Sequence, residues 1–191
     1  MDILFASGEA HPLVKTGGLA DVSGSLPRAI KNLKQEIRLI LPAYPVARAN
    51  AGVLKLVKEI SLPGSQRPVR ILHGRLPHTR VQLYLIDAPE YFDRSGGPYS
   101  TPEGKDWPDN AARFALFAQA VCAVAMNQAG LDWKPDLVHC NDWQTGLVPA
   151  LLSRQTERPA TVFTIHNLAY QGLFGWDQFK ALQLPQNWWS P

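Results

Sequence analysis

Short runs of apolar residues alternate in this chain with longer segments in which apolar residues recur every three or four positions. The first strand-like run covers residues 3–5, the first helix-like segment residues 19–33, and the second strand-like run residues 37–42. A strand, a helix and a strand in this order form a βαβ unit, whose two strands lie parallel in one sheet. This order therefore predicts an α/β fold.

The same alternation returns in the second half of the chain. Residues 110–129 form the clearest helical segment, apolar on nearly every face, so we expect this helix to be buried. A strand at 136–140, a helix at 142–155 and a strand at 160–166 follow it. Together the two halves predict an open, doubly wound, mostly parallel sheet with helices on both faces.

The middle of the chain follows a different pattern. Residues 53–62, 69–76 and 81–86 are β-like runs separated by turn residues, and only the third run reads as fully buried. We expect them to form a meander or hairpin added to one edge of the sheet. Residues 87–108 form a polar stretch rich in glycine and proline, whose length indicates a functional or mobile segment.

Composition narrows the class of protein further. The chain has 191 residues, of which 46% are hydrophobic and 18% charged, so we expect one globular domain with a sizeable core. The formal charge is only +3, and the lysines and arginines are scattered along the chain. Nucleic acid is therefore not an expected partner.

The sequence shows neither a signal peptide nor a segment suited to spanning a membrane. The longest apolar stretch, residues 111–126, contains Arg113 and Gln119 and is shorter than a bilayer requires. We therefore expect a cytoplasmic protein with no membrane contact. Cys122 and Cys140 lie in apolar surroundings and are expected to be buried, reduced thiols.

In an open parallel sheet, ligands bind at the carboxyl ends of the strands. Polar loops follow the strand-like runs at three such ends, with the sequences "SGEAHPLVKTGG", "CNDWQTG" and "HNLAYQG". We expect the functional site among these loops. No pair of histidines or carboxylates has the spacing of metal ligands on a helix, so no metal site is predicted.

The first loop holds the pattern of a phosphate-binding site. Gly17 and Gly18 lie at the start of a helix, where bare backbone amides and the helix dipole favour an anion, and Lys15 adds a cation. The spacing matches neither a Walker A loop nor a dinucleotide-binding fingerprint. A flexible loop with a solvated Lys15 is an equally good interpretation of the spacing alone.

The other two loops allow two interpretations each. His166 and Asn167 end a strand and would either bind sugar hydroxyls or cap a loop. Asp142 would either face the same crevice or act as the N-cap of the following helix. Asp21 and Tyr99 lie in or beside loops on this side, and each taken alone reads as structural or exposed.

Taken together, "KTGGLADV", "HCNDWQTGLVPALL" and "TIHNLAYQG" resemble the bacterial glycogen synthases and plant starch synthases, the retaining glucosyltransferases of glycosyltransferase family 5. The resemblance covers essentially the whole chain. It implies a GT-B architecture, in which two Rossmann-like domains face each other across a cleft. It also implies transfer of glucose from ADP-glucose to the non-reducing end of an α-1,4-glucan such as glycogen, without a cofactor.

The resemblance also implies roles for individual residues. Lys15 would contact the donor, and the two glycines would leave room for its diphosphate. His166 would bond the glucosyl moiety, and Tyr99 matches a tyrosine near the donor. The residues expected at the site are the catalytic pair His166 and Asp142 and the substrate-binding set Lys15, Gly17, Gly18, Asn167, Tyr99 and Asp21.

By the same resemblance, residues 1–191 would be an incomplete N-terminal, acceptor-side domain, and the C-terminal nucleotide-binding domain would be absent. We expect such a fragment to be inactive alone. We also expect it to expose apolar surface around Trp188 and Trp189 and to self-associate. One alternative is a glucan-binding module that catalyses no reaction. Another is a nicotinamide-dependent oxidoreductase, but the chain lacks the dinucleotide-binding fingerprint expected of one.

Overall fold

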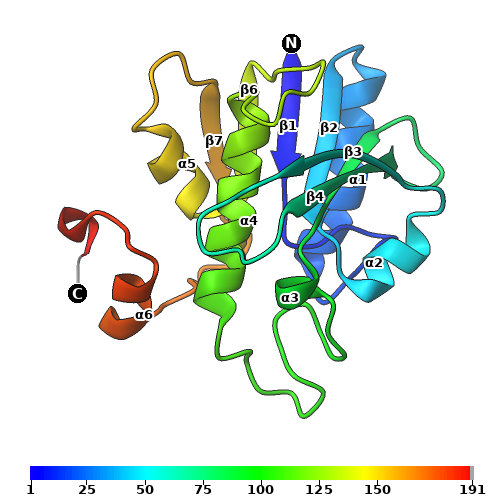
Figure 1. Cartoon of the computed structure of the whole chain (residues 1–191). Coiled ribbons are helices and arrows are strands. Elements are labelled where there is room, and N and C mark those ends of the chain that lie inside the picture. The colour runs from blue at the N-terminus through cyan, green and yellow to red at the C-terminus, as the bar shows by residue number, and fades with distance from the viewer. Residues whose placement is uncertain (190–191) are drawn as a thin grey trace.

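The computed structural model describes residues 1–189, which form an α/β structure around a single sheet of seven strands (Figure 1). The strand order is β3-β4-β5-β2-β1-β6-β7. Five neighbouring strands, β5, β2, β1, β6 and β7, run parallel, whereas β4 pairs antiparallel with both β5 and β3. The strands are β1 (Asp2–Ala6), β2 (Glu36–Pro42), β3 (Lys55–Ile60), β4 (Val69–Arg75), β5 (Gln82–Asp87), β6 (Leu137–Asn141) and β7 (Ala160–Thr164).

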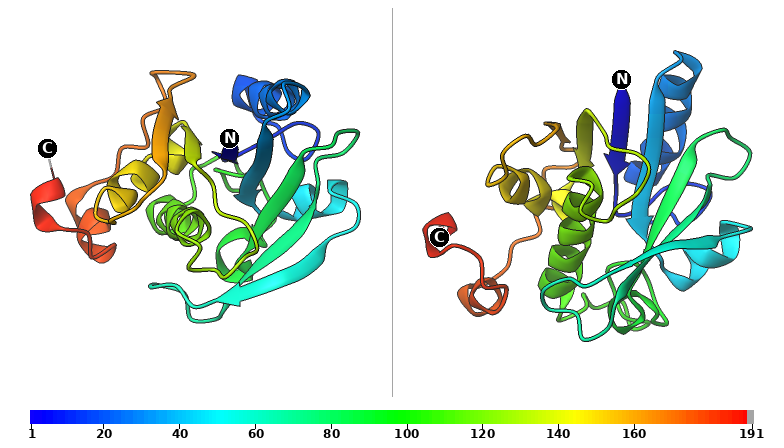
Figure 2. Two further views of the ribbon diagram at one scale, coloured as in Figure 1. Left: turned by 90° about the horizontal axis from the view of Figure 1, so that it is seen from above. Right: turned by 45° about the horizontal axis from the view of Figure 1, so that its top comes forward.

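Helices cover both faces of this sheet. Seen from above in Figure 2, α1 lies on one face, and α4 and α5 lie on the other. The helices are α1 (Gly18–Asn32), α2 (Pro45–Asn50), α3 (Pro89–Phe92), α4 (Asn110–Ala125), α5 (Leu147–Leu152) and α6 (Trp176–Ala181), with 3-10 turns η1 (Trp143–Thr145) and η2 (Gln186–Trp188). The doubly wound, mostly parallel fold predicted from the sequence is confirmed.

The core lies between the sheet and α4. The central strand β1 is buried along its whole length after Asp2, and α4 is buried on nearly every face, as its uniformly apolar sequence predicted. The edge strands β3, β4 and β5 curve around α4 in Figure 2 and enclose it from a further side. The expected antiparallel addition at one edge of the sheet is confirmed.

Several helical segments differ from the prediction, and α3, α6 and η2 were not predicted at all. The helix expected at 110–129 ends at Ala125, and Asn127 then adopts a φ of 55°, a left-handed conformation that a helix cannot contain. The helix expected at 142–155 is split into η1 and α5. Residues 45–50 form a short helix that was not predicted, because six residues are too few to show a period.

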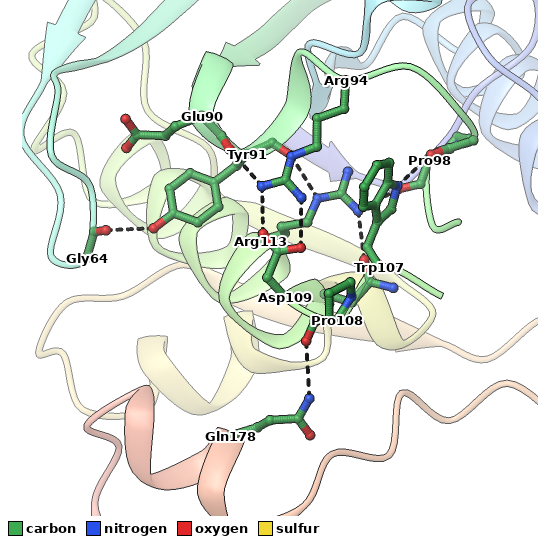
Figure 3. Close-up of polar contacts among 12 residues, drawn as sticks. Gly64, Glu90, Tyr91, Arg94, Pro98, Trp107, Pro108, Asp109, Arg113 and Gln178 are labelled. Atoms are coloured by element: carbon green, nitrogen blue, oxygen red, sulfur yellow. Dashed lines mark hydrogen bonds and ion pairs between the residues drawn. The ribbon is translucent and has the colours of Figure 1, made fainter. Parts of the chain in front are cut away.

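Residues 87–108, predicted to be functional or mobile, form a well-anchored loop. Arg94 and Arg113 reach into it from its base and from α4, and together they hold several of its backbone carbonyls (Figure 3). Within residues 1–189, none of the helices has the length and hydropathy needed to cross a bilayer.

Candidate functional site

The three polar loops meet at the carboxyl edge of the parallel strands, as the sequence predicted. Asn141, the last residue of β6, donates from Nδ2 to the carbonyl of Ala6 at the end of β1, over 3.0 Å. Its Oδ1 lies 3.0 Å from Nε2 of His166, just beyond β7. Because Asn141 Oδ1 is an acceptor, Nε2 of His166 is the donor in this contact, and Nδ1 is left for another partner.

Asp142 directs its side chain to His166 and does not cap the helix that follows it. Its Oδ1 accepts a hydrogen bond from the backbone amide of His166 over 2.7 Å, and its side chain makes no capping bond to η1. The residue is buried and has a φ of 55° and a ψ of −177°, a conformation that is rare outside glycine. Of the two interpretations of Asp142, the N-cap is therefore wrong.

Glu9, which the sequence analysis did not single out, is the second carboxylate of the site. It is 2% exposed, and its Oε2 accepts a hydrogen bond from the amide of Thr16 at the entrance of α1. Burial raises the pKa of Glu9, the amides of Thr16 and Gly17 oppose that rise, and the negative charge of Asp142 adds to it. The sequence feature that could have identified Glu9 is an acidic residue in the loop directly after a buried strand.

Lys15 and Asp21 form an ion pair beside this crevice. The Lys15 Nζ lies 2.7 Å from both carboxylate oxygens of Asp21, and the two side chains are 49% and 57% exposed. A pair this exposed contributes little to folding stability. It does hold the amine next to the first turn of α1.

Gly17 and Gly18 open this first turn, and neither is required by the fold itself. Gly17 is the N-cap with an extended φ of −150°, and no side chain caps the helix. A Cβ added at Gly17 would lie 4.0 Å from Glu9 Oε1, and one added at Gly18 would meet nothing within 4 Å. Gly24, by contrast, is required by the fold, because a Cβ at this position would lie 2.3 Å from the carbonyl oxygen of His11.

Tyr99 reaches the crevice from the loop before α4. Its ring packs on Trp143 and Phe114, with 5.8 Å between ring centroids in each case. Burial raises the pKa of Tyr99 well above its ordinary value. Its hydroxyl oxygen and Oε1 of Gln144 are both buried and have no hydrogen-bond partner among the described residues. Gln144 was assigned no role from the sequence.

Gly8 allows these two side chains to approach the end of β1. A Cβ at position 8 would lie 2.8 Å from both the Tyr99 hydroxyl oxygen and Cγ of Gln144. Asn167 lies apart from this group. It is exposed, and its Oδ1 accepts from the amide of Ala169 over 2.9 Å within its own turn.

A cavity of about 680 Å³ borders the site on the side of α4 and α5. Trp143 and Gln144 line it together with Phe163 of β7 and the half-buried Trp188 and Trp189 of the C-terminal segment. No group of three or more histidines, cysteines or carboxylates within residues 1–189 is placed to hold a metal ion.

The chain was then compared with known proteins. The family model described as the starch synthase catalytic domain matches residues 2–191. The chain belongs to this family. The family resemblance stated from the three sequence motifs is thereby confirmed.

Among curated relatives, the glycogen synthase of Thioalkalivibrio sulfidiphilus is 57% identical over 190 residues, which are 99% of this chain and 39% of that protein. The glycogen synthase of Cellvibrio japonicus is 56% identical over 98% of this chain and 39% of its own length. A solved structure, the catalytic domain of starch synthase IV from Arabidopsis thaliana bound to ADP and acarbose, is similar with a TM-score of 0.80. It is 25% identical and is covered over 38% of its length, so the chain spans about two fifths of its relatives.

Proposed function

We propose that this chain supplies the acceptor-side part of a retaining glucosyltransferase, which moves glucose from ADP-glucose to the non-reducing end of an α-1,4-glucan such as glycogen. Family membership and relatives named glycogen synthase support this assignment. Because the chain covers only 39% of such a relative, we infer that turnover also needs a nucleotide-binding half. Residues 1–191 would then be an incomplete N-terminal domain.

The observation that carries the proposal is the open space around Gly17 and Gly18. Neither backbone strain nor a neighbouring side chain explains two adjacent glycines at the start of a fifteen-residue helix. The amides of Thr16 and Gly17 already contact the Glu9 carboxylate, whereas the next amides of the first turn have no partner within the helix and attract anions. A diphosphate that approaches the backbone closely accounts for both glycines, and Lys15 stands beside it.

The chemistry of the transfer fits this arrangement. Negative charge grows on the departing diphosphate in the transition state, so an amine and fixed amides stabilise the transition state more than the ground state. One charge-assisted hydrogen bond is worth about 1.5–3 kcal/mol. Because Lys15 and the amides supply positive charge, the proposal requires neither a metal nor another cofactor.

The opposite wall of the crevice would receive the sugar. The Nδ1 of His166 can accept a hydrogen bond from a glucosyl hydroxyl, because the Nε2 already contacts Asn141. Asp142, whose charge reaches Glu9 beside the glycines, would place negative charge near an oxocarbenium-like sugar. The hydroxyl of Tyr99 is buried beside Gly8 and Gln144, so it would have to become accessible to bind a sugar hydroxyl. Asn167 would have to leave its turn to take part.

The test compares the chain alone with a chimera in which it replaces the corresponding part of the Thioalkalivibrio sulfidiphilus glycogen synthase. Incorporation of radiolabelled ADP-glucose into glycogen is measured for both, and glycogen co-sedimentation for the chain alone. We expect turnover by the chimera and no significant turnover by the chain. A folded chimera that binds glycogen without turnover would favour the alternative, a non-catalytic glucan-binding module.

A further inference from the structure

We propose that Arg113 and Asn110, in the first turn of α4, are a positioning pair that fixes Tyr99 in the wall of the crevice. They do so by holding the two backbone carbonyls on either side of the Tyr99 Cα atom. The inference rests on the proposed function in one respect, since the role of Tyr99 in sugar binding is assigned there.

Each carbonyl accepts a hydrogen bond from one member of the pair, and the Tyr99 carbonyl also accepts one from the backbone amide of Trp107 over 3.0 Å. Arg113 Nη1 donates to the carbonyl of Pro98 over 3.0 Å, and Asn110 Nδ2 donates to the carbonyl of Tyr99 over 2.9 Å. The two donors are coupled, because Arg113 Nη1 also donates to Oδ1 of Asn110 over 2.7 Å. This bond orients the Asn110 amide so that its Nδ2 must face Tyr99. Figure 3 shows the Arg113 guanidinium directed into the loop.

Burial of the charged Arg113 side chain is energetically unfavourable, and a purely structural role does not require a charge at this position. Its side chain is 1% exposed, and among residues 1–189 no carboxylate forms an ion pair with it. Its remaining recorded acceptor is the neutral carbonyl of Tyr91, at 2.8 Å. Asp109 acts on Arg113 electrostatically without a direct ion pair, so burial of this charge stays unfavourable compared with an apolar side chain on the same helix face. What the guanidinium adds is the direction of several hydrogen bonds from one rigid group.

Tyr99 needs this support because its other contacts fix no direction. Its ring packs against Phe114 and Trp143, and ring packing tolerates sliding. Its hydroxyl has no partner among the described residues. The position of that hydroxyl beside Gly8 is therefore determined by the backbone of the loop, and Arg113 and Asn110 hold that backbone.

Arg94 provides a matched control in the same loop. It donates to Asp109 Oδ1 and Oδ2 over 2.8 and 2.6 Å and to the carbonyl of Glu90 over 2.7 Å (Figure 3). It therefore fastens the base of the loop and bonds to neither of the two carbonyls around Tyr99. Replacing Arg94 loosens the loop without removing the contacts on which the proposal depends.

The experiment uses fluorine NMR of the chain labelled with 3-fluorotyrosine. The chain has five tyrosines, so the resonances can be assigned with single Tyr→Phe variants. The parent is compared with Asn110→Asp and with the control Arg94→Met. In Asn110→Asp the acceptor for Arg113 is kept, while the donor to the Tyr99 carbonyl is lost. Asn110→Ala, which removes the donor without adding a charge, is the second variant in case the first does not fold.

We expect the Tyr99 resonance to shift and broaden in Asn110→Asp, while those of the buried Tyr44 and the exposed Tyr170 stay in place. Arg94→Met should leave Tyr99 nearly unchanged. An unmoved Tyr99 resonance in the folded variant overturns the proposal. Equal effects of Asn110→Asp and Arg94→Met also overturn it, because loosening of the whole loop would then explain both.

A maltoheptaose titration of the same samples separates this inference from the proposed function. We expect Asn110→Asp to weaken sugar binding by up to about tenfold, the loss of one hydrogen bond between neutral groups, and Arg94→Met to have no effect. If the folded parent does not bind the sugar, the proposed role of the crevice fails, whereas the fluorine spectra still decide whether the pair positions Tyr99.

Discussion

The carboxylate of Asp142 accepts a hydrogen bond from the backbone amide of His166 at 2.7 Å, and the backbone amide of Asp142 donates to the carbonyl of Thr164 at 2.9 Å. The contact between β6 and β7 thus continues past the last paired residues of the two strands. Asn141 holds the imidazole of His166 at the same time. Two consecutive residues therefore fix both the backbone and the ring of one candidate sugar-binding side chain.

This double contact predicts a difference between two substitutions at position 142. Asp142→Ala loses the bond to His166 and keeps the unfavourable backbone, so we expect a loss of about 1–3 kcal/mol in the free energy of unfolding. Asp142→Gly loses the same bond but relieves the backbone, and it should be closer to the parent. Urea unfolding measures both. Equal losses in the two variants would show that the positive φ carries no strain.

Lys15→Ala should separate stability from activity. The ion pair with Asp21 is exposed, so we expect the free energy of unfolding to change by no more than about 1 kcal/mol. In the active chimera the same substitution should lower turnover about ten- to a hundredfold. Thermal unfolding and ADP-glucose incorporation are the measurements, with Lys34→Ala on the far end of α1 as the matched control. A large drop in the melting temperature with unchanged turnover per folded molecule contradicts the assignment.

Glu9→Gln should stabilise the fold in a pH-dependent way. Burial raises the pKa of Glu9 above its ordinary value of 4.5, so the folded chain holds this proton more tightly than the unfolded chain does. The contribution of Glu9 to the free energy of unfolding therefore falls as the pH rises from the pKa of Glu9 in the unfolded chain to its pKa in the folded chain. Glutamine does not ionise, so the variant shows no such fall. The stability advantage of Glu9→Gln should grow upward from about pH 4 and level off once Glu9 is ionised in the folded chain. Urea unfolding of the parent and of Glu9→Gln at a series of pH values tests this. A difference in the free energy of unfolding that does not change with pH would refute the prediction.

The outer edge of β7 predicts self-association. No strand pairs with this edge among residues 1–189, and Val162, Phe163 and Ile165 are 43%, 44% and 54% exposed. Trp188 and Trp189, where the sequence analysis expected such surface, are half-buried. We expect concentration-dependent association in sedimentation velocity, weakened by Val162→Lys.

The opposite edge of the sheet supplies the control for this prediction. Leu56→Lys on β3 places the same charge at a residue that is 53% exposed. It should leave the association unchanged. An equal effect of the two lysines, or a chain that stays monomeric at all concentrations, would remove β7 as the contact surface.

The order of the helices and strands could be predicted because the spacing of apolar residues along the sequence indicates which face of each element is buried. It shows β1, α1 and β2 clearly, since their apolar residues are spaced regularly over whole elements. The ends of elements depend on single backbone conformations. Asn127 and Asp142 both adopt a positive φ, and no period indicates where a left-handed residue will fall.

The site was predicted only as far as its motifs extend. Strand ends and adjacent glycines pointed to Lys15, Asp142 and His166, because the ligand-binding edge of a parallel sheet follows from topology. Glu9 was missed because its importance comes from burial, which arises only when α1 packs back over the first loop. The approach of Gln144 to Tyr99 is likewise a tertiary contact between segments far apart in the sequence.

Gly8 makes the order of substitutions matter in any attempt to reshape the crevice. A methyl group at this position would collide with the Tyr99 hydroxyl and with Gln144 at 2.8 Å, so the three positions cannot be varied independently. Side chains at 99 and 144 must shrink before the one at 8 can grow. Descendants of this sequence that begin with a larger residue at position 8 face a barrier, whereas those that first shorten its neighbours have an open path to a differently shaped surface at the end of β1.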